Sequence, residues 1–184
     1  MANLGFQTVY RLLNRIDHVV CERVFLPEPD EATAAVTSLE SARPLQDFDC
    51  LAFSLSFESD YVHILSILQK AGLPLPAVHR DGALPLVMAG GVSCFLNPEP
   101  IAPFFDCFLI GEAEELLPAF FERFDPRADR DRFLRDAARA LPGVYVPSLY
   151  QDTYAPDGTL HAFTPLADAP PRVRRVQAAD ISRF

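Results

Sequence analysis

Apolar residues gather in three short runs, separated by longer segments in which apolar and polar positions alternate at helical spacing. The runs lie at residues 49–55, 85–91 and 106–111, and the last two end in glycine. Runs of this kind are typical of strands that are buried on both faces of a parallel sheet. We therefore predict three parallel strands, with the strand at 49–55 in the centre of the sheet.

Helical periodicity predicts amphipathic helices around these strands, with Asn3 as the N-cap of the first and Gly72 as the stop of the second. We also expect a strand at 19–26 and only a short helix within 27–44. Strands that alternate with helices indicate an α/β fold with helices on both faces and right-handed crossovers. The predicted helices span residues 3–14, 58–71, 112–124 and 130–141.

The order of elements at the amino end is unusual for this fold class. Such sheets usually begin with a strand that becomes central, whereas here the first helix begins almost at Met1. We therefore expect the first strand to be missing, either because the chain is trimmed or because the sheet lacks it. A homodimer through the exposed sheet edge is one assembly that this would allow.

Residues 143–184 differ in character from the segment before them. Val144–Val146 and His161–Phe163 flank a turn at Pro156–Gly158, which predicts a β-hairpin. Pro170 and Pro171 then break the chain ahead of a basic segment. We divide the chain into a Rossmann-type domain at 1–142 and a hairpin and linker extension at 143–184.

Charge and cysteine spacing exclude several classes of function. The net charge is −9 and Lys70 is the single lysine, which argues against a nucleic-acid or anionic-membrane surface. No run reaches the roughly 18 apolar residues of a membrane span. The four cysteines have no local metal-binding spacing, and Cys50 and Cys107 lie inside apolar runs as buried free thiols would. These features fit a reducing cytoplasm.

Six residues follow the three strands at the edge where ligands bind in open α/β sheets. Hydroxyl groups there can hydrogen-bond a nucleotide tail, and glycines remove the Cβ atoms that would block a cofactor. Ordinary turns and strand ends explain the same serines and glycines, and helix capping explains the glutamate. Both interpretations stay open. The candidate cofactor-binding residues are Ser54, Ser56, Gly90, Gly91, Gly111 and Glu112.

No pattern of residues predicts catalysis or a metal site in this chain. Cys94 follows the glycine pair, but no histidine is near it in sequence, so we expect an inert thiol. The four histidines lack HxxxH or HExxH spacing, and His63 is expected at the solvent boundary. The GxxxxGK[ST] motif of nucleotide hydrolases and the GxSxG motif of serine hydrolases are both absent from the sequence.

Five segments resemble, in order, the N-terminal cobalamin-binding-like domain of radical S-adenosylmethionine (radical SAM) proteins. The similarity is greatest to an uncharacterised branch that carries this domain ahead of a radical SAM barrel. It covers about residues 1–125 and the basic segment near Arg174. The segments are Asn-Leu-Gly-Phe-Gln-Thr-Val-Tyr at 3–10, Phe-Ser-Leu-Ser-Phe-Glu at 53–58, Ala-Gly-Gly at 89–91, Asn-Pro-Glu-Pro at 97–100 and Ile-Gly-Glu-Ala-Glu at 110–114.

The resemblance implies a doubly wound, flavodoxin-like fold and an accessory role beside a radical SAM barrel in the same or an adjacent polypeptide. That barrel would hold the [4Fe–4S] cluster and S-adenosylmethionine, because its CxxxCxxC motif is absent from this sequence. Ala2 stands where the cobalt-ligating histidine of cobalamin modules would lie. The resemblance therefore implies histidine-off cobalamin binding or none. The alternative is a stand-alone, non-catalytic, flavodoxin-like protein-interaction module.

Overall fold

Four strands form one sheet in the order β1–β2–β3–β4 in the computed structural model, which describes residues 4–27, 35–166 and 168–178. Strands β1, β2 and β3 are parallel, and β4 pairs antiparallel with β3. Ser54, Gly90 and Leu109 are neighbours in register at the carboxyl ends of the parallel strands. The strands span Cys50–Ser54 (β1), Leu86–Gly90 (β2), Cys107–Leu109 (β3) and Val144–Tyr145 (β4).

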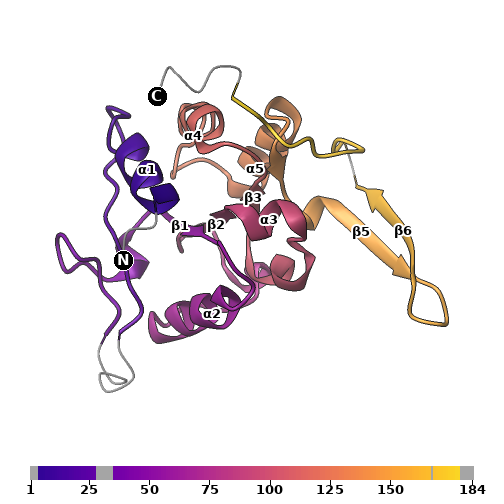
Figure 1. Ribbon diagram of the computed structural model, residues 1–184, viewed down its shortest axis with the longest axis horizontal. Helices are drawn as coiled ribbons and strands as arrows, with labels where there is room; N and C mark the ends of the chain where they lie inside the picture. Colours follow the sequence, from indigo (N-terminus) through magenta and orange to yellow (C-terminus); the bar gives the residue numbers. More distant parts are fainter. Residues whose placement is uncertain (1–3, 28–34, 167, 179–184) are drawn as a thin grey trace.

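Helices cover both faces of this sheet (Figure 1). Helices α1, α4 and α5 pack on one face, and α2 and α3 pack on the other. Their bounds are Leu4–Leu13 (α1), Asp60–Lys70 (α2), Val92–Leu96 (α3), Ala113–Phe121 (α4) and Arg130–Ala140 (α5). Single-turn 3₁₀ segments lie at Leu45–Asp47, Ala77–His79 and Pro147–Leu149, and a longer one at Glu99–Phe104.

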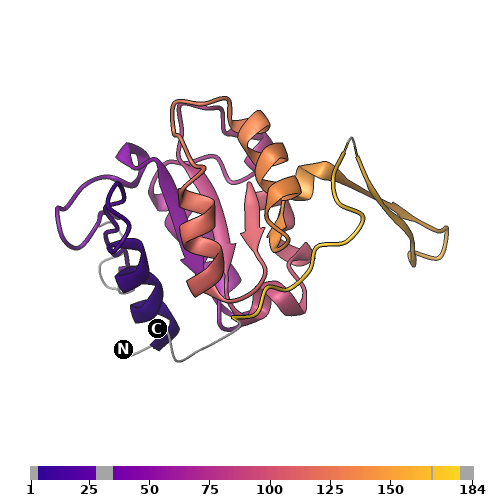
Figure 2. The same cartoon turned by 90° about the horizontal axis from the view of Figure 1, so that it is seen from above.

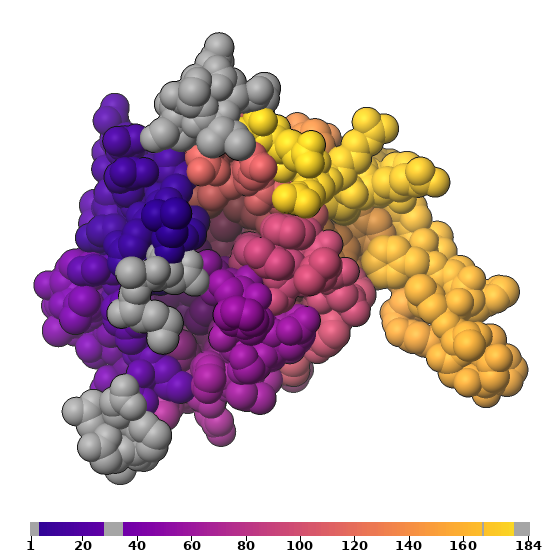
Figure 3. All heavy atoms as spheres, viewed as in Figure 1, coloured from indigo at the N-terminus to yellow at the C-terminus, as the bar shows by residue number. Residues whose placement is uncertain are grey.

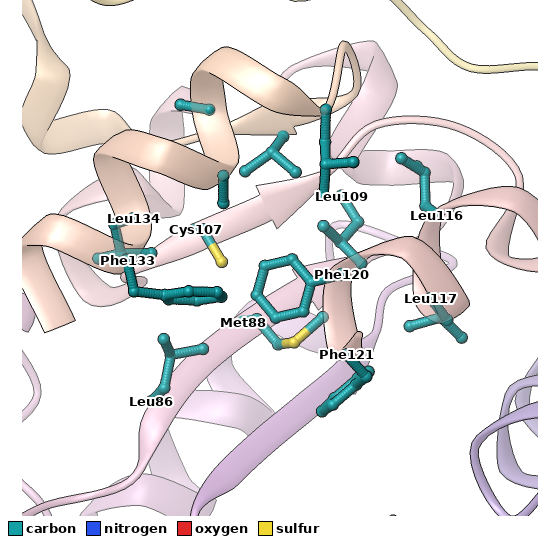
Figure 4. Packing of buried hydrophobic residues seen from close by; sticks show 14 of the residues in the cluster. Leu86, Met88, Cys107, Leu109, Leu116, Leu117, Phe120, Phe121, Phe133 and Leu134 are labelled. Carbon is teal, nitrogen blue, oxygen red and sulfur yellow. The ribbon is translucent and has the colours of Figure 1, made fainter. Parts of the chain in front are cut away.

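Alternation along the strands builds a core on each side of the sheet. Leu86 and Met88 of β2 join the cluster under α1, α4 and α5, whereas Val87 and Ala89 join the cluster under α2 and α3. Figure 4 shows Phe120 of α4 pointing toward Met88 and Cys107 of the sheet. This two-sided burial confirms the predicted α/β fold with a mostly parallel sheet, and the architecture is consistent with a flavodoxin-like fold.

Two strand predictions were wrong in detail. The strand at 49–55 is not central: β1 pairs only with β2 and forms an edge of the described sheet. Residues 19–26 form no strand, because no described segment pairs with their backbone as a ladder. Residues 35–44 contain a bridge between Thr37 and Pro44 and no helix. Residues 28–34, which belong to the segment where the short helix was expected, and the expected N-cap Asn3 lie outside the described residues.

The hairpin turns at Pro156–Gly158 as predicted, and residues 161–163 lie in its second strand, but its first strand is not the predicted segment 144–146. Strand β5 (Tyr150–Tyr154) pairs with β6 (Leu160–Pro165), and the pair projects from the sheet and its helices (Figures 1 and 2). Val144 and Tyr145 instead complete the main sheet as β4, since both side chains are buried against it. The division of the chain at residue 142 into two domains remains a prediction.

Candidate functional site

The carboxyl edge of the parallel strands holds the predicted cofactor-binding residues. Ser54 ends β1, Gly90 ends β2, and Gly111 follows β3. Figure 3 looks onto this edge and shows the surface hollowed between α1, α3 and α4. The structure therefore brings these residues to one edge of the sheet. The contacts that each residue makes decide what this edge can bind.

Gly91 is required by the close approach of two segments of this chain. Its φ is +111°, and a Cβ atom there would lie 2.3 Å from the carbonyl oxygen of Leu55. The Leu55 amide donates to the Gly90 carbonyl at 2.8 Å, which holds the end of β1 against the turn into α3. This glycine has an explanation within the fold, because no L side chain fits the space or the dihedral angle.

Gly111 admits a second segment of the chain, residues 172–178, which we call the C-terminal strap. Its φ is +142°, and a Cβ atom there would lie 2.4 Å from the carbonyl oxygen of Val176. Val176 donates to the Ile110 carbonyl and accepts from the Glu112 amide, both at 3.0 Å. The strap therefore forms a parallel bridge across the end of β3.

The Glu112 side chain also holds the strap. Its carboxylate accepts a hydrogen bond from the Ala178 amide at 2.6 Å. Further along the strap, the Arg174 amide donates to the Pro142 carbonyl at 3.0 Å, and the Arg175 guanidinium lies 4.4 Å from the centre of the Phe95 ring. The backbone and side-chain contacts of Glu112 thus anchor the strap beside α4.

Ser54, Ser56 and Gly90 lie at the other end of this edge, beyond β1 and β2. The Ser54 side chain is exposed. The Ser56 amide donates to the Asp60 carboxylate at 3.1 Å, which fixes the turn before α2. Gly90 has an ordinary dihedral angle, and a Cβ atom there would lie 3.4 Å from the Leu109 carbonyl oxygen. Gly90 is therefore the glycine of this edge that the chain's own conformation requires least.

The cysteines lie in settings that suppress ionisation. Cys94 is buried, and burial raises the pKa of its thiol to about 12. Burial raises the thiol pKa of Cys50 and Cys107 as well. Burial, with the charges of Glu40 and Glu22, raises the pKa of Cys21 to about 11. Thiolates are the reactive form, so these side chains are poor nucleophiles near neutral pH.

The titratable side chains of the described residues give no metal site. Within residues 4–27, 35–166 and 168–178, no group of three or more His, Cys, Asp or Glu side chains is placed to hold a metal ion. His63 is exposed on α2, as predicted. In the same described part, no helix is both long and apolar enough to cross a membrane.

A buried ion pair that the sequence did not indicate lies at the opposite, amino edge of the sheet. Arg80 Nη2 is 3.3 Å from Asp106 Oδ2, and the Arg80 side chain is fully buried. Arg80 also donates to the carbonyls of Pro74, Leu75 and Phe104, and Asp106 accepts from the Val87 amide at 2.7 Å. These bonds join loops to the starts of β2 and β3, so the pair is structural.

The geometry defines an α/β domain whose carboxyl edge is partly occupied by its own C-terminal strap. A family described as "Radical SAM proteins, N-terminal" matches residues 5–147. The chain belongs to this family. The matched segment includes all four strands of the main sheet and ends before the projecting hairpin.

The chain is also similar to an uncharacterized protein of Methanocaldococcus jannaschii. The two are 29% identical over 128 residues, which cover 67% of this chain and 27% of that protein. The chain thus matches about a quarter of the relative's length. No solved structure matches the chain.

A corrinoid or nucleotide fits this edge poorly where the strap crosses it. The glycine and carboxylate that would line the end of β3, Gly111 and Glu112, contact the strap backbone instead. A ligand would have to use the Ser54 and Gly90 end or displace the strap.

Proposed function

We propose that this chain is an accessory, non-catalytic domain that works beside a radical SAM barrel in the same or an adjacent polypeptide. The family match over residues 5–147 is the observation that carries this proposal. The archaeal relative is longer than the segment that this chain matches, as a protein with a further domain would be. The barrel would bind the [4Fe–4S] cluster and S-adenosylmethionine and perform the radical chemistry. A reducing cytoplasm suits such a cluster and the unpaired cysteines of this domain.

We further propose that the domain resembles a cobalamin-binding module but binds cobalamin weakly or not at all. Any binding would be histidine-off, since Ala2 stands in place of a cobalt ligand. The strap contacts of Gly111 and Glu112 support this view, because they use two of the six candidate residues for internal packing. Ser54, Ser56 and Gly90 would carry whatever binding remains.

The projecting hairpin is a suitable docking element for the barrel. Tyr154, Leu160 and Phe163 are 63%, 57% and 43% exposed, which is high for large apolar side chains. The Tyr150 and Phe163 rings stack 5.1 Å apart and stiffen its base. A two-stranded hairpin is marginally stable by itself, so contact with a partner would stabilise it. The same surface would serve the second candidate function, a stand-alone interaction module.

The enzymatic proposal is tested by measuring 5′-deoxyadenosine formation from S-adenosylmethionine under anaerobic, reducing conditions. The full-length protein that carries this domain should form the product after cluster reconstitution, and the isolated chain should form none. Product formation by the isolated chain would overturn the non-catalytic assignment.

Docking is tested by mixing the isolated chain with a separately expressed barrel and measuring complex formation by size-exclusion chromatography. The hairpin variant Tyr154→Ser/Leu160→Ser should lose the complex. Val78→Ser is the matched control, because Val78 is 83% exposed but lies away from the hairpin in the segment Ala77–His79. Equal binding by all three proteins would exclude the hairpin as the docking element, and capture of no barrel at all would favour the stand-alone module.

Cobalamin binding is tested separately by titration with hydroxocobalamin and gel filtration. We expect no corrinoid absorbance in the protein peak. A stoichiometric corrinoid spectrum that Gly90→Val abolishes, while circular dichroism stays unchanged, would overturn the proposal and establish the Ser54 and Gly90 end as a binding site.

A further inference from the structure

The C-terminal strap buries little of its own surface, and none of its side chains is fully buried. The exposed side chains are those of Arg172, Arg174, Arg175 and Gln177, and the half-buried ones are those of Val173, Val176 and Ala178. A segment that has surface hydrogen bonds and little buried apolar area opens at a lower free energy than the core does. The strap can therefore leave its place without unfolding the sheet beneath it.

Departure of the strap would uncover the end of β3. Figure 3 shows the strap, in yellow, beside α4. The strap backbone at Val176 lies where a side chain on Gly111 would begin, and it pairs with the Ile110 carbonyl and the Glu112 amide. The Glu112 carboxylate accepts from the Ala178 amide. Once the strap has left, these polar groups are available to another molecule at the carboxyl edge of the sheet.

A side chain of the hairpin holds the chain just before the strap. Tyr150, the first residue of β5, donates its hydroxyl to the Pro170 carbonyl at 2.8 Å. Pro170 and Pro171 are consecutive, and their rings fix both φ angles, so the chain from this carbonyl to the strap is stiff. Arg139 and Asp168 form an exposed ion pair nearby, which contributes little. The position of the Tyr150 hydroxyl therefore affects where the strap begins.

The Tyr150 ring is fixed by the hairpin and by the main sheet together. It stacks on Phe163 of β6 with ring centroids 5.1 Å apart, and its centroid lies 5.3 Å from that of Tyr145 in β4. Tyr145 in turn donates its hydroxyl to the Glu99 carboxylate. Because the Tyr150 ring belongs to the hairpin, a tilt of the hairpin against the sheet moves its hydroxyl relative to the Pro170 carbonyl.

We propose that the strap is an autoinhibitory element of the carboxyl edge and that the hairpin controls it through Tyr150. A partner that binds a tilted hairpin more tightly than the hairpin seen here would break the hydrogen bond to Pro170 and loosen the strap. Gly111 and Glu112 would then be accessible to a ligand. The identity of this partner as the barrel rests on the proposed function, whereas the coupling between hairpin and strap lies within this chain.

Amide hydrogen exchange of the full chain, measured by NMR, tests the coupling. Tyr150→Phe keeps the ring and removes the hydroxyl. Exchange at the Val176 and Glu112 amides, which join the strap to β3, should become about fivefold faster, as expected for one lost hydrogen bond. The Val87 amide, which donates to Asp106 in the core, should keep its rate.

Two further variants make the comparison specific. Tyr154→Phe is the matched control, because that hydroxyl bonds Asp152 within the hairpin, and it should leave the strap amides unchanged. Coupling between two sites is reciprocal. Gly111→Ala, which displaces the strap, should therefore speed exchange of the Leu166 amide, which donates to the Leu149 carbonyl at the base of the hairpin.

Unchanged exchange at Val176 and Glu112 in Tyr150→Phe would overturn the proposal. Equal acceleration at Val87 would overturn it too, because the whole fold would then have been weakened. Should Tyr150→Phe not fold, Pro170→Gly relaxes the connection and gives the same comparison.

The separately expressed barrel tests the direction of the effect. Its addition should speed exchange at Val176 and Glu112 of the natural chain, and slower exchange in the complex would overturn the autoinhibitory assignment. A barrel that does not bind would overturn the proposed partner, and the variants, which need no barrel, would still decide the coupling.

Discussion

Gly111 and Val176 meet so closely that the backbone of one occupies the space where a side chain of the other would begin. A Cβ atom on Gly111 would lie 2.4 Å from the Val176 carbonyl oxygen and 2.6 Å from its amide nitrogen. The C-terminal strap is thus built against a glycine, and this contact converts part of a predicted cofactor crevice into an internal interface. The strap can approach β3 this closely only because residue 111 has no Cβ atom.

Gly111→Ala should therefore release or distort the strap and lower the free energy of unfolding by about 1–3 kcal/mol. The positive φ of +142° adds strain to the clash. Urea denaturation followed by circular dichroism measures the loss. Gly82→Ala is the matched control, since no atom lies within 4 Å of a Cβ at Gly82 and its φ is outside the strained range. That variant should match or slightly exceed the stability of the natural chain. Equal stability of the two variants would contradict the close contact with Val176.

The adjacent glycines Gly90 and Gly91 should respond differently to alanine. At Gly91 the added Cβ would lie 2.3 Å from the Leu55 carbonyl oxygen with φ at +111°, so a loss of about 1–3 kcal/mol in unfolding free energy is expected. At Gly90 the shortest contact would be 3.4 Å and the dihedral angle is ordinary, so a smaller loss is expected. Thermal and urea unfolding of both variants measure the difference. A larger loss of unfolding free energy at Gly90 than at Gly91 would contradict the conclusion that the turn into α3 requires a glycine at residue 91.

The parts of the fold that the sequence predicted are those set by uniform burial or strong helical periodicity. Every position of β2 before Gly90 is buried, so its apolar run identified it without knowledge of its neighbours. Residues 19–26 are also largely apolar, with Glu22 and Arg23 as exceptions, yet a strand needs a backbone partner, and the sequence of one segment does not show its partner. Strand β4 has two residues, Val144 and Tyr145, which is too short for a periodic signal.

The sequence predicted where the candidate site residues lie in the sheet, but it did not predict which contacts they make. Glycines at strand ends are visible in the sequence, but the bridge between Gly111 and Val176 depends on where the strap returns. The buried pair of Arg80 and Asp106 had no sequence signal, because the two residues are 26 positions apart in the chain and meet only through folding.

That buried pair should be the most sensitive polar contact of the core. Asp106→Ala would leave the fully buried Arg80 guanidinium without its carboxylate and the Val87 amide without its acceptor, at a cost of about 3–5 kcal/mol in unfolding free energy. Replacing both partners, as Arg80→Met/Asp106→Leu, should cost less than the sum of the single changes, because the buried Arg80 charge is then not left without its carboxylate. Arg130, whose Nη1 lies 4.0 Å from Asp106 Oδ1, loses that carboxylate in Asp106→Ala and in the double variant alike.

A double-mutant cycle by urea denaturation measures this coupling. Arg132→Ala serves as the surface control, because Arg132 and Asp136 are 3.8 Å apart but largely exposed, and it should change stability little. Additive effects at Arg80 and Asp106 would contradict direct coupling between their side chains.

Stability should fall in alkaline solution because of the buried thiols, and Cys94 gives the clearest case. Burial raises its pKa from 9.0 to about 12. Below about pH 9 both the folded and the unfolded chain keep the proton, so the full stability is present. As the pH rises from there toward 12, only the unfolded chain loses the proton, and the free energy of unfolding falls by about 1.4 kcal/mol for each pH unit. Urea denaturation of the natural chain and of Cys94→Ala across this range measures the effect as a difference in slope. The variant should lose less stability with rising pH, because it has one fewer thiol that ionises on unfolding, and parallel slopes would show that Cys94 ionises equally in both states.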